Sequence, residues 1–179
     1  IFGFFITGFL DDYLSIKNRK NTGLKSKEKF ILQSIISIIF IFIAYENDLI
    51  NPLIKISESW EIDTSIFIFP ISFLVLVGIS NSVNLTDGLD GLAAGCSGIV
   101  FYGLGTEILM KEQKELFVFS LLCYSMSGIC LGFLKYNNYP AKIFMGDTGS
   151  LSIGAILGSI ALLTNSVFTL SIFLSLIHI

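Results

Sequence analysis

Long apolar segments alternate with short polar ones along most of this 179-residue chain. A helix that crosses a bilayer needs about 20 mostly apolar residues, within a range of roughly 17–25. Several segments approach this length, and shorter apolar segments stand at both ends. The predicted spans cover residues 1–10, 30–45, 66–83, 92–109, 117–134, 151–164 and 167–179. The pattern predicts an all-α fold, a polytopic transmembrane helix bundle of about six to seven spans.

The composition also favours a membrane protein. Apolar residues make up 53% of the chain and charged residues only 14%, against about 25% charged residues in an ordinary soluble domain. We expect residues 1–179 to form a single membrane domain, and the short end segments predict that it is truncated at both ends. The chain lacks the basic surface that binds nucleic acid, so nucleic acid is excluded as a partner.

The cysteines and the histidine predict no metal chemistry of their own. Cys96, Cys123 and Cys130 lie in apolar segments without a CxxC motif, so they are interpreted as small hydrophobic side chains. His178, the single histidine, is the second-last residue, which argues against a zinc site.

The distribution of basic residues predicts which ends of the spans face the cytoplasm. Helix counting puts the polar segments 11–29, 84–91 and 135–150 on one side, and 46–65, 110–116 and 165–166 on the other. The first set holds Lys17, Arg19, Lys20, Lys25, Lys27, Lys29, Lys135 and Lys142, and the second holds only Lys55, Lys111 and Lys114. The positive-inside rule therefore makes the first set cytoplasmic.

The 46–65 segment is acidic and contains two β-prone stretches, "LIKI" and "SIFIF". Stretches of this kind separated by a few polar residues are typical of a hairpin. A short extracytoplasmic β-hairpin is therefore predicted here.

Three acidic motifs fall on the predicted cytoplasmic side, although they are far apart in the sequence. They are "LDDYL", "NLTDGLDG" and "FMGDTGS". Their aspartates are Asp11, Asp12, Asp87, Asp90 and Asp147. Because helix counting brings all three motifs to one membrane face, these carboxylates are predicted to converge on one site.

Asp11 and Asp12 are predicted to end the first apolar helix. The helix dipole is negative at that point and disfavours carboxylates, so the pair makes chemical sense where a cation neutralises it. A solvated helix end explains the pair equally well.

The segment "NLTDGLDG" offers Asn84, Asp87 and Asp90 with glycines among them. Hard oxygen ligands of this kind suit Mg²⁺, which usually takes one or two carboxylates together with substrate phosphates. The alternative is a polar turn with Asp90 as the N-cap of the next helix. A turn needs one such residue rather than three, which favours a functional site.

Asp147 stands where a membrane helix is predicted to begin, and free N–H groups at a helix start attract phosphate or carboxylate. An ordinary N-cap at Asp147 or Thr148 is the alternative. "DTG" also occurs in aspartic proteases, which need two such aspartates, whereas this chain has one DTG.

The basic segment after Asp12 is by default a topology signal that contacts anionic lipid. Lys29 is the lysine best placed to hold a diphosphate, because it stands where the next helix begins. Carboxylates that bind Mg²⁺ together with lysines that hold phosphate indicate phosphoryl-type transfer between a soluble and a lipid substrate.

The stretches "GFLDDYLSIKNRKNTGLKSKEKFILQ", "NSVNLTDGLDGLAAG" and "YNNYPAKIFMGDTGSLSIG" resemble the polyprenyl-phosphate N-acetylhexosamine-1-phosphate transferases. The motifs "NLTDGLDGLA" and "PAKIFMGDTGS" favour the muramoyl-pentapeptide branch of that family. The resemblance implies transfer of phospho-N-acetylmuramoyl-pentapeptide from UDP to undecaprenyl phosphate, which yields lipid I and UMP for peptidoglycan. It also implies a Mg²⁺ cofactor, a bacterial inner-membrane location with a cytoplasmic site and a possible homodimer.

The resemblance assigns roles to individual positions. Asp11 and Asp12 match the family's first aspartate pair, and Lys29 matches a basic active-site position, so all three are expected to be catalytic. Asp147 matches the Mg²⁺ ligand. Some members carry a lysine where this chain has Ser15, so that basic contact is not expected here.

The remaining assignments concern the loops. Asp87 is expected to be catalytic and Asn84 and Asp90 to bind substrate, by their match to the second acidic motif. Asn137 and Phe144 match positions that contribute to nucleotide binding. The family's histidine-rich cytoplasmic loop and first spans are absent from these residues, so residues 1–179 alone are not expected to catalyse. The ending "SLIHI" resembles a translated sequencing adapter rather than the family.

Two other functions compete with this interpretation. A transferase of the same family that uses UDP-N-acetylglucosamine would carry out the same chemistry on another sugar. A cation channel or transporter would place an acidic ring at midplane depth, whereas these acids lie at helix ends. An inert scaffold leaves the five same-side aspartates unexplained.

Overall fold

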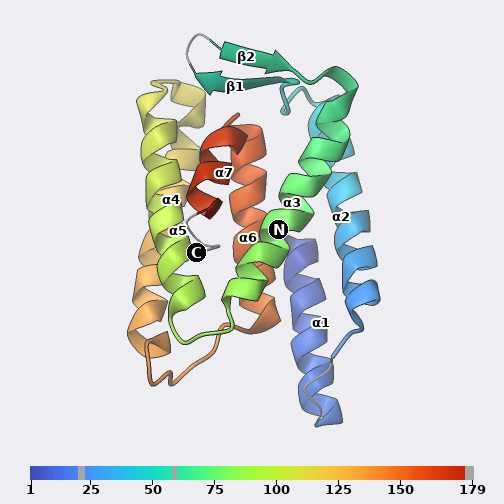
Figure 1. Cartoon of the computed structure of the whole chain (residues 1–179), viewed down its shortest axis with the longest axis vertical. Helices are drawn as coiled ribbons and strands as arrows, with labels where there is room; N and C mark the ends of the chain where they lie inside the picture. The colour runs from blue at the N-terminus through green and yellow to red at the C-terminus, as the bar shows by residue number, and fades with distance from the viewer. Residues whose placement is uncertain (20–22, 58–59, 176–179) are drawn as a thin grey trace.

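The computed structural model describes residues 1–19, 23–57 and 60–175. Its long helices run roughly parallel or antiparallel to one another as a bundle, with a small hairpin across one end (Figure 1). The helices are α1 (Phe2–Asn18), α2 (Ser26–Glu46), α3 (Ile68–Thr86), α4 (Leu92–Met110), α5 (Phe117–Asn137), α6 (Gly146–Leu163) and α7 (Val167–Ser175). The strands are β1 (Leu53–Ser57) and β2 (Trp60–Asp63), and the short 3₁₀ turns are η1 (Ser65–Phe67) and η2 (Lys114–Leu116).

The predicted all-α membrane bundle is confirmed. Among the described residues, five helical segments are long and apolar enough to span a bilayer: Ser26–Glu46, Ser65–Thr86, Leu92–Met110, Lys114–Asn137 and Gly146–Leu163. A hairpin is present in the predicted segment, with β1 and β2 paired antiparallel and Leu53 opposite Asp63. Its second strand is Trp60–Asp63, whereas the predicted stretch "SIFIF" forms η1 and the start of α3.

Apolar contacts and buried hydroxyls hold the bundle together. The largest core cluster joins α3, α4, α5 and α6 around Phe101, Leu104 and Leu157, which are fully buried. The Ser80 hydroxyl of α3 donates to the Leu151 carbonyl of α6 at 2.9 Å. The Ser127 hydroxyl of α5 donates to the Gly98 carbonyl of α4 at 2.8 Å. Such bonds satisfy buried hydroxyls that lipid could not.

The helix boundaries correct several sequence predictions. Helix α1 continues to Asn18, so Asp11 and Asp12 lie within it and do not end it. Most of the predicted 11–29 loop is therefore helical, since α2 already begins at Ser26. Helix α3 extends to Thr86 and α5 to Asn137, while α6 begins at Gly146. The apolar pattern underestimated these helices because the last turns of α3 and α5 and the first turn of α6 carry polar side chains of the site.

Part of the C-terminal segment and one basic residue lie outside the described residues. Helix α7 covers nine residues of the predicted 167–179 span. Lys20 and His178, both named above, lie outside the described residues.

The topology gathers the three acidic motifs at one end of the bundle. The lower half of α1, the α3–α4 turn and the α5–α6 connection lie at the lower end in Figure 1, whereas the hairpin and the α4–α5 turn lie at the upper end. The helix count along the chain and the spatial arrangement therefore agree on which polar segments share a side.

The arrangement predicts opposite accessibility for the two ends. With a thiol reagent that cannot cross membranes, Ile66→Cys and Met110→Cys should label from outside intact cells. Leu89→Cys and Tyr139→Cys should label only after the membrane is opened. All four side chains are exposed in the structure. Labelling of Leu89→Cys from outside would contradict the predicted cytoplasmic location.

The background for this measurement comes from the three natural cysteines. Cys123 and Cys130 are buried and Cys96 is half-buried. Changing all three to alanine gives the parent for the labelling variants, and its yield in the membrane fraction serves as the folding control.

Candidate active site

Three carboxylates from two helices meet at the lower end of the bundle. One oxygen from each of Asp11, Asp12 and Asp147 lies within 4.8 Å of the others. Asp11 is 7% exposed, and the other two are partly buried. Gly8 makes the meeting possible, because its Cα lies so close to the Asp147 backbone that a side chain there would overlap it. Helices α1 and α6 can therefore approach within backbone contact beside the acids.

Lys29, in the first turn of α2, supplies the positive charge of the cluster. Its Nζ lies 2.6 Å from Asp147 Oδ2 and 3.2 Å from Asp11 Oδ1. All three side chains are at least three-quarters covered. Removing one partner of such a pair leaves a poorly solvated charge, which is costly at low dielectric. One ammonium therefore links α1, α2 and α6.

Asn84 fixes the second oxygen of Asp147. The Asn84 amide donates to Asp147 Oδ1 at 2.8 Å and to the Ser150 hydroxyl at 2.8 Å. Because Lys29 donates to the other oxygen, the carboxylate plane of Asp147 is set by α2 and α3 together. The hydroxyl of Ser150, one turn along α6, donates a hydrogen bond to the Gly146 carbonyl at 2.8 Å.

Asp12 caps α6 from another helix. Its Oδ1 accepts from the Asp147 N–H at 3.1 Å, and its Oδ2 accepts from the Thr148 N–H at 2.9 Å and the Thr148 hydroxyl at 2.5 Å. A carboxylate at a helix start satisfies free N–H groups and suits the positive end of the dipole. Gly146 leads into this turn with φ of 65°, a conformation that glycine adopts easily. The sequence-based alternative of an N-cap at Asp147 or Thr148 is wrong, since the cap comes from α1.

Asp11 also organises the chain that follows α1. Its Oδ1 accepts a hydrogen bond from the Leu24 N–H at 2.7 Å. The segment entering α2 therefore lies against α1, which brings Lys29 back toward the acid pair.

Asp87 follows α3 directly and lies near the cluster without an ion pair among the described residues. Burial raises the pKa of Asp87 from its ordinary 3.8 to about 6, and the charges of Asp147 and Asp12 add to the increase. A backbone hydrogen bond from Gly146 partly opposes the shift. The carboxyl of Asp87 can therefore exchange a proton near neutral pH.

Asp90 and Asn137 belong to a neighbouring group of contacts that joins the α3–α4 turn to the α5–α6 connection. Asp90 Oδ2 accepts from the Ala141 N–H at 2.9 Å. Asn137, only 2% exposed, accepts from the Gly91 N–H at 3.1 Å and donates to the Ile143 carbonyl at 2.9 Å. These bonds hold the segment that carries Phe144, whose ring is 75% exposed. The N-cap of α4 is Gly91 rather than Asp90.

The donor set of the acid cluster fits a hard divalent cation. Three carboxylates offer oxygen ligands at the spacing that one ion can bridge, and a single ammonium leaves a net negative charge among them. Asp147 is the residue for which metal binding is predicted from the sequence, and the structure brings Asp11 and Asp12 beside it. Sequence reasoning considered Thr148 only as an N-cap and assigned no role to Ser150 and Leu24. Their partners come from distant helices, so no local motif identifies them.

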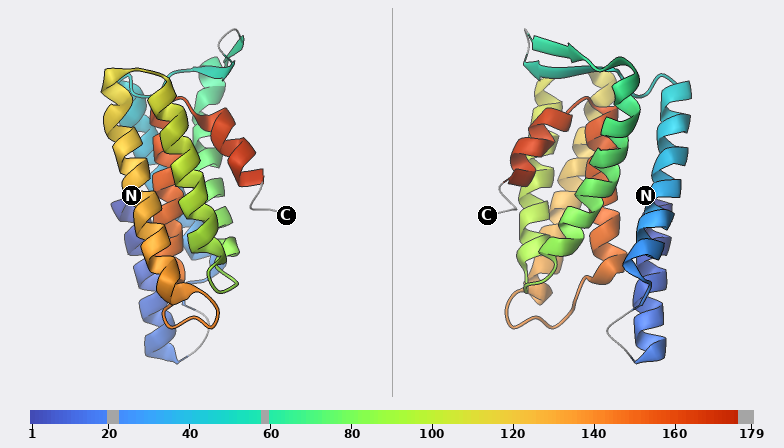
Figure 2. Two further views of the ribbon diagram at one scale, coloured as in Figure 1. Left: turned by 90° about the vertical axis from the view of Figure 1, so that its left-hand side faces the viewer. Right: turned by 45° about the vertical axis from the view of Figure 1, so that its right-hand side comes forward.

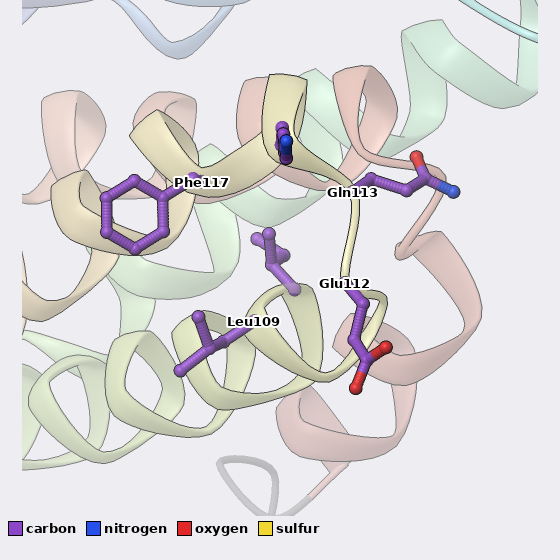
Figure 3. A pocket seen from close by; sticks show the side chains of 6 residues that line it. Leu109, Glu112, Gln113 and Phe117 are labelled. Atoms are coloured by element: carbon purple, nitrogen blue, oxygen red, sulfur yellow. The ribbon is translucent and has the colours of Figure 1, made fainter.

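A separate cavity lies at the opposite end of the bundle. It has a volume of about 370 Å³ between the end of α4 and the start of α5, and Figure 3 shows the side chains around it. Ile108, Leu109, Glu112, Gln113, Lys114 and Phe117 line it. None of these residues belongs to the acid cluster, so the cavity is not part of the candidate active site.

The cap that Asp12 provides should be measurable as stability. Asp12→Ala should lower the free energy of unfolding by about 1–3 kcal/mol, the cost of leaving partly buried donors unpaired. Thr148→Val tests the same contact from α6, so the double variant should lose less than the sum of the two single losses. The measurement is chemical unfolding in detergent. Additive losses would show that the two side chains act independently.

The raised pKa of Asp87 predicts a pH-dependent stability. A group protonated more readily in the folded state than in the unfolded state stabilises the fold fully below pH about 4 and loses that contribution as the pH rises through about 6. In chelator-containing buffer, the melting temperature should therefore fall more in the parent chain than in Asp87→Asn between about pH 4.5 and about pH 7, which lie on either side of the folded-state pKa. Equal falls in both proteins would contradict the shift.

Comparison with known proteins gives the family. The family model described as glycosyl transferase family 4 matches residues 1–165. A phospho-N-acetylmuramoyl-pentapeptide-transferase of Prochlorococcus marinus strain MIT 9312 is 86% identical over 173 residues, which cover 97% of this chain and 48% of that protein. A protein with the same name from Listeria monocytogenes is 44% identical over 158 residues, 88% of this chain and 48% of that protein.

The chain thus spans about half the length of the curated relatives it matches. The matched residues include Asp11, Asp12, Lys29 and Asp147, so the acid cluster lies wholly within the family region. On this match, the chain belongs to glycosyl transferase family 4.

Proposed function

We propose that this chain carries the catalytic centre of an enzyme that transfers phospho-N-acetylmuramoyl-pentapeptide from UDP to undecaprenyl phosphate. The products are lipid I and UMP. The observation that carries the proposal is the cluster of Asp11, Asp12 and Asp147 around Lys29 at one end of a transmembrane bundle. Relatives that carry this activity in their names support the choice of substrates.

Asp147 is proposed to bind Mg²⁺, with Asp11 and Asp12 beside it. Bound there, Mg²⁺ would neutralise the diphosphate of the nucleotide substrate and stabilise the charge that develops as the phosphoryl group moves. Asn84 holds Asp147 in the required orientation by its 2.8 Å hydrogen bond. Asp12 keeps its oxygens close to the cluster while it caps α6.

Lys29 is proposed to hold the diphosphate from the side of α2. Its ammonium already contacts two carboxylates, so a phosphate that enters the cluster meets a positive group fixed in place. The exposed ring of Phe144 offers a face on which a uracil base can stack. Asn137 and Asp90 are proposed to support uracil binding indirectly. Their hydrogen bonds fix the α5–α6 connection that carries Phe144.

The acceptor needs little deprotonation. A phosphate monoester has its second pKa near about 6, so undecaprenyl phosphate is mostly dianionic at neutral pH and already nucleophilic. The larger barrier is the approach of this anion to an anionic diphosphate, which a positively charged site lowers. Asp11 and Asp12 are therefore proposed to position cation and lipid phosphate rather than to remove a proton.

The apolar helices support a multi-pass membrane location. We propose that this membrane is the bacterial inner membrane and that the acid cluster lies on the cytoplasmic side. A homodimer is part of the same proposal. A related transferase for UDP-N-acetylglucosamine is the alternative within the family. The channel or transporter alternative is disfavoured, because the acids gather at one end of the helices and Lys29 neutralises part of their charge.

The proposal predicts that Asp147→Asn abolishes transfer. The assay uses a chimera in which this chain replaces the matching 173 residues of the Prochlorococcus marinus relative, so that the other half of the protein is supplied. Asp48→Asn, in the turn after α2 at the other end of the bundle, is the matched control and should keep full activity. Near-normal turnover of Asp147→Asn at saturating Mg²⁺, in a folded chimera, would remove Asp147 from the site.

The role of Asp11 can be separated from general-base catalysis by pH. Asp11→Asn should reduce the transfer rate by a similar factor at pH 7 and pH 9, because the lipid phosphate is already ionised at both. Asp12→Asn should behave in the same way. Substantial recovery of either variant at pH 9, with Mg²⁺ affinity unchanged, would restore the general-base role.

A further inference from the structure

Helix α2 lies at the edge of the bundle and buries little of itself. It stands beside α1 and α3 at the edge of the bundle, as the right-hand view of Figure 2 shows. Only Gln33, Ser37, Ile41 and Ala44 are buried along it. These residues repeat every three or four positions, so α2 packs through one narrow stripe. The position of Lys29 therefore depends on few contacts.

Two polar contacts fasten this stripe near the site. Lys29 donates a hydrogen bond to Oδ2 of Asp147. Asn84 of α3 donates a hydrogen bond to Oδ1 of the same carboxylate. One turn deeper on α2, Gln33 Oε1 accepts a hydrogen bond from Asn81 Nδ2 of α3 at 2.5 Å. Lys29 and Gln33 are four residues apart and Asn81 and Asn84 three apart, so the two contacts lie one above the other.

The orientation of the Gln33 amide is determined by its surroundings. Asn81 Nδ2 also donates to the Val77 carbonyl at 2.8 Å, which requires an N–H₂ group at that position. Gln33 must therefore present its oxygen to Asn81 and turn its own Nε2 away. Among the described residues that Nε2 has no partner, although Gln33 is 1% exposed.

A buried amide whose N–H₂ group has no hydrogen-bond partner lowers the stability of the fold. An apolar side chain of similar size would fill the same space without leaving a donor unsatisfied. Among the described residues, the Gln33 side chain makes one hydrogen bond, to Asn81 of α3, one turn below Lys29. This combination points to a role in placing Lys29.

We propose that Gln33 and Asn81 are positioning residues of the transferase: their hydrogen bond sets the depth and rotation of α2, and so holds the Lys29 ammonium between Asp11 and Asp147. This inference rests on the proposed function for its effect on turnover. Its structural part, the placement of a cation beside three carboxylates, is independent of the substrate.

The test compares Gln33→Leu in two backgrounds of the full-length chimera, the parent and Lys29→Met. In the parent background, Gln33→Leu should lower turnover roughly tenfold and tighten Mn²⁺ binding at the acid cluster, because the ammonium that competes with the metal is held less firmly. In the Lys29→Met background the same change should alter neither quantity, since residues that act as a unit are not additive.

Controls separate positioning from folding. The melting temperature of Gln33→Leu should equal or exceed that of the parent, and Gln33→Met serves if the leucine variant folds poorly. Exchange of the two amides, Gln33→Asn with Asn81→Gln, should restore most of the turnover. Ser37 lies one turn deeper on the same buried face, and its hydroxyl has no partner within the described part of the chain, so Ser37→Ala should leave turnover unchanged.

Equal effects of Gln33→Leu in both backgrounds, or no effect on Mn²⁺ affinity and turnover in the parent, would overturn the inference. A parent chimera that binds Mn²⁺ but transfers nothing would count against the proposed function only. The Mn²⁺ comparison by electron paramagnetic resonance would then still decide the role of Gln33.

Discussion

The contact of Lys29 with Asp147 and Asp11 determines how the polar end of this bundle is built. Three carboxylates within 4.8 Å repel one another, and partial burial removes the water that would screen them. The ammonium at 2.6 Å and 3.2 Å offsets part of that repulsion and fastens α2 to α1 and α6. The remaining negative charge is what makes the cluster suitable for a divalent cation. The same contact thus serves the fold and the proposed chemistry.

The other acids divide between structure and reactivity according to their partners. Asp12 is occupied by the start of α6, and Asp90 holds the Ala141 N–H of the α5–α6 connection. Asp87 accepts a backbone hydrogen bond from Gly146, yet burial raises its pKa to about 6. A carboxyl kept partly neutral beside charged ones can donate as well as accept a hydrogen bond, which suits a group that faces phosphate oxygens. Neighbouring aspartates of one motif therefore have different chemical roles.

The sequence predicted the architecture well and the details of the site less well. Apolar periodicity is a strong signal, so the spans and the shared side of the acidic motifs followed from it. The hairpin was expected in the correct segment, but its second strand is Trp60–Asp63 rather than the β-prone stretch that follows it. It misplaced the end of α1, because Asp11 and Asp12 interrupt the apolar pattern while partners from α2 and α6 let the helix continue. The link between Asp12 and Thr148 and that between Gln33 and Asn81 join different helices. No spacing along one helix reveals such a pair.

The cap of α6 by Asp12 has a consequence for the order of assembly. The two residues it joins, Asp12 and Thr148, are 136 positions apart in the chain. At a synthesis rate of roughly 5–20 residues per second, α6 emerges on the order of ten seconds after α1. During that interval Asp12 lacks the N–H donors of α6, while Lys29 is synthesised soon after Asp11. The contact of Lys29 with Asp11 can therefore form before α6 exists, and the later arrival of α6 adds Asp147 and completes the acid cluster.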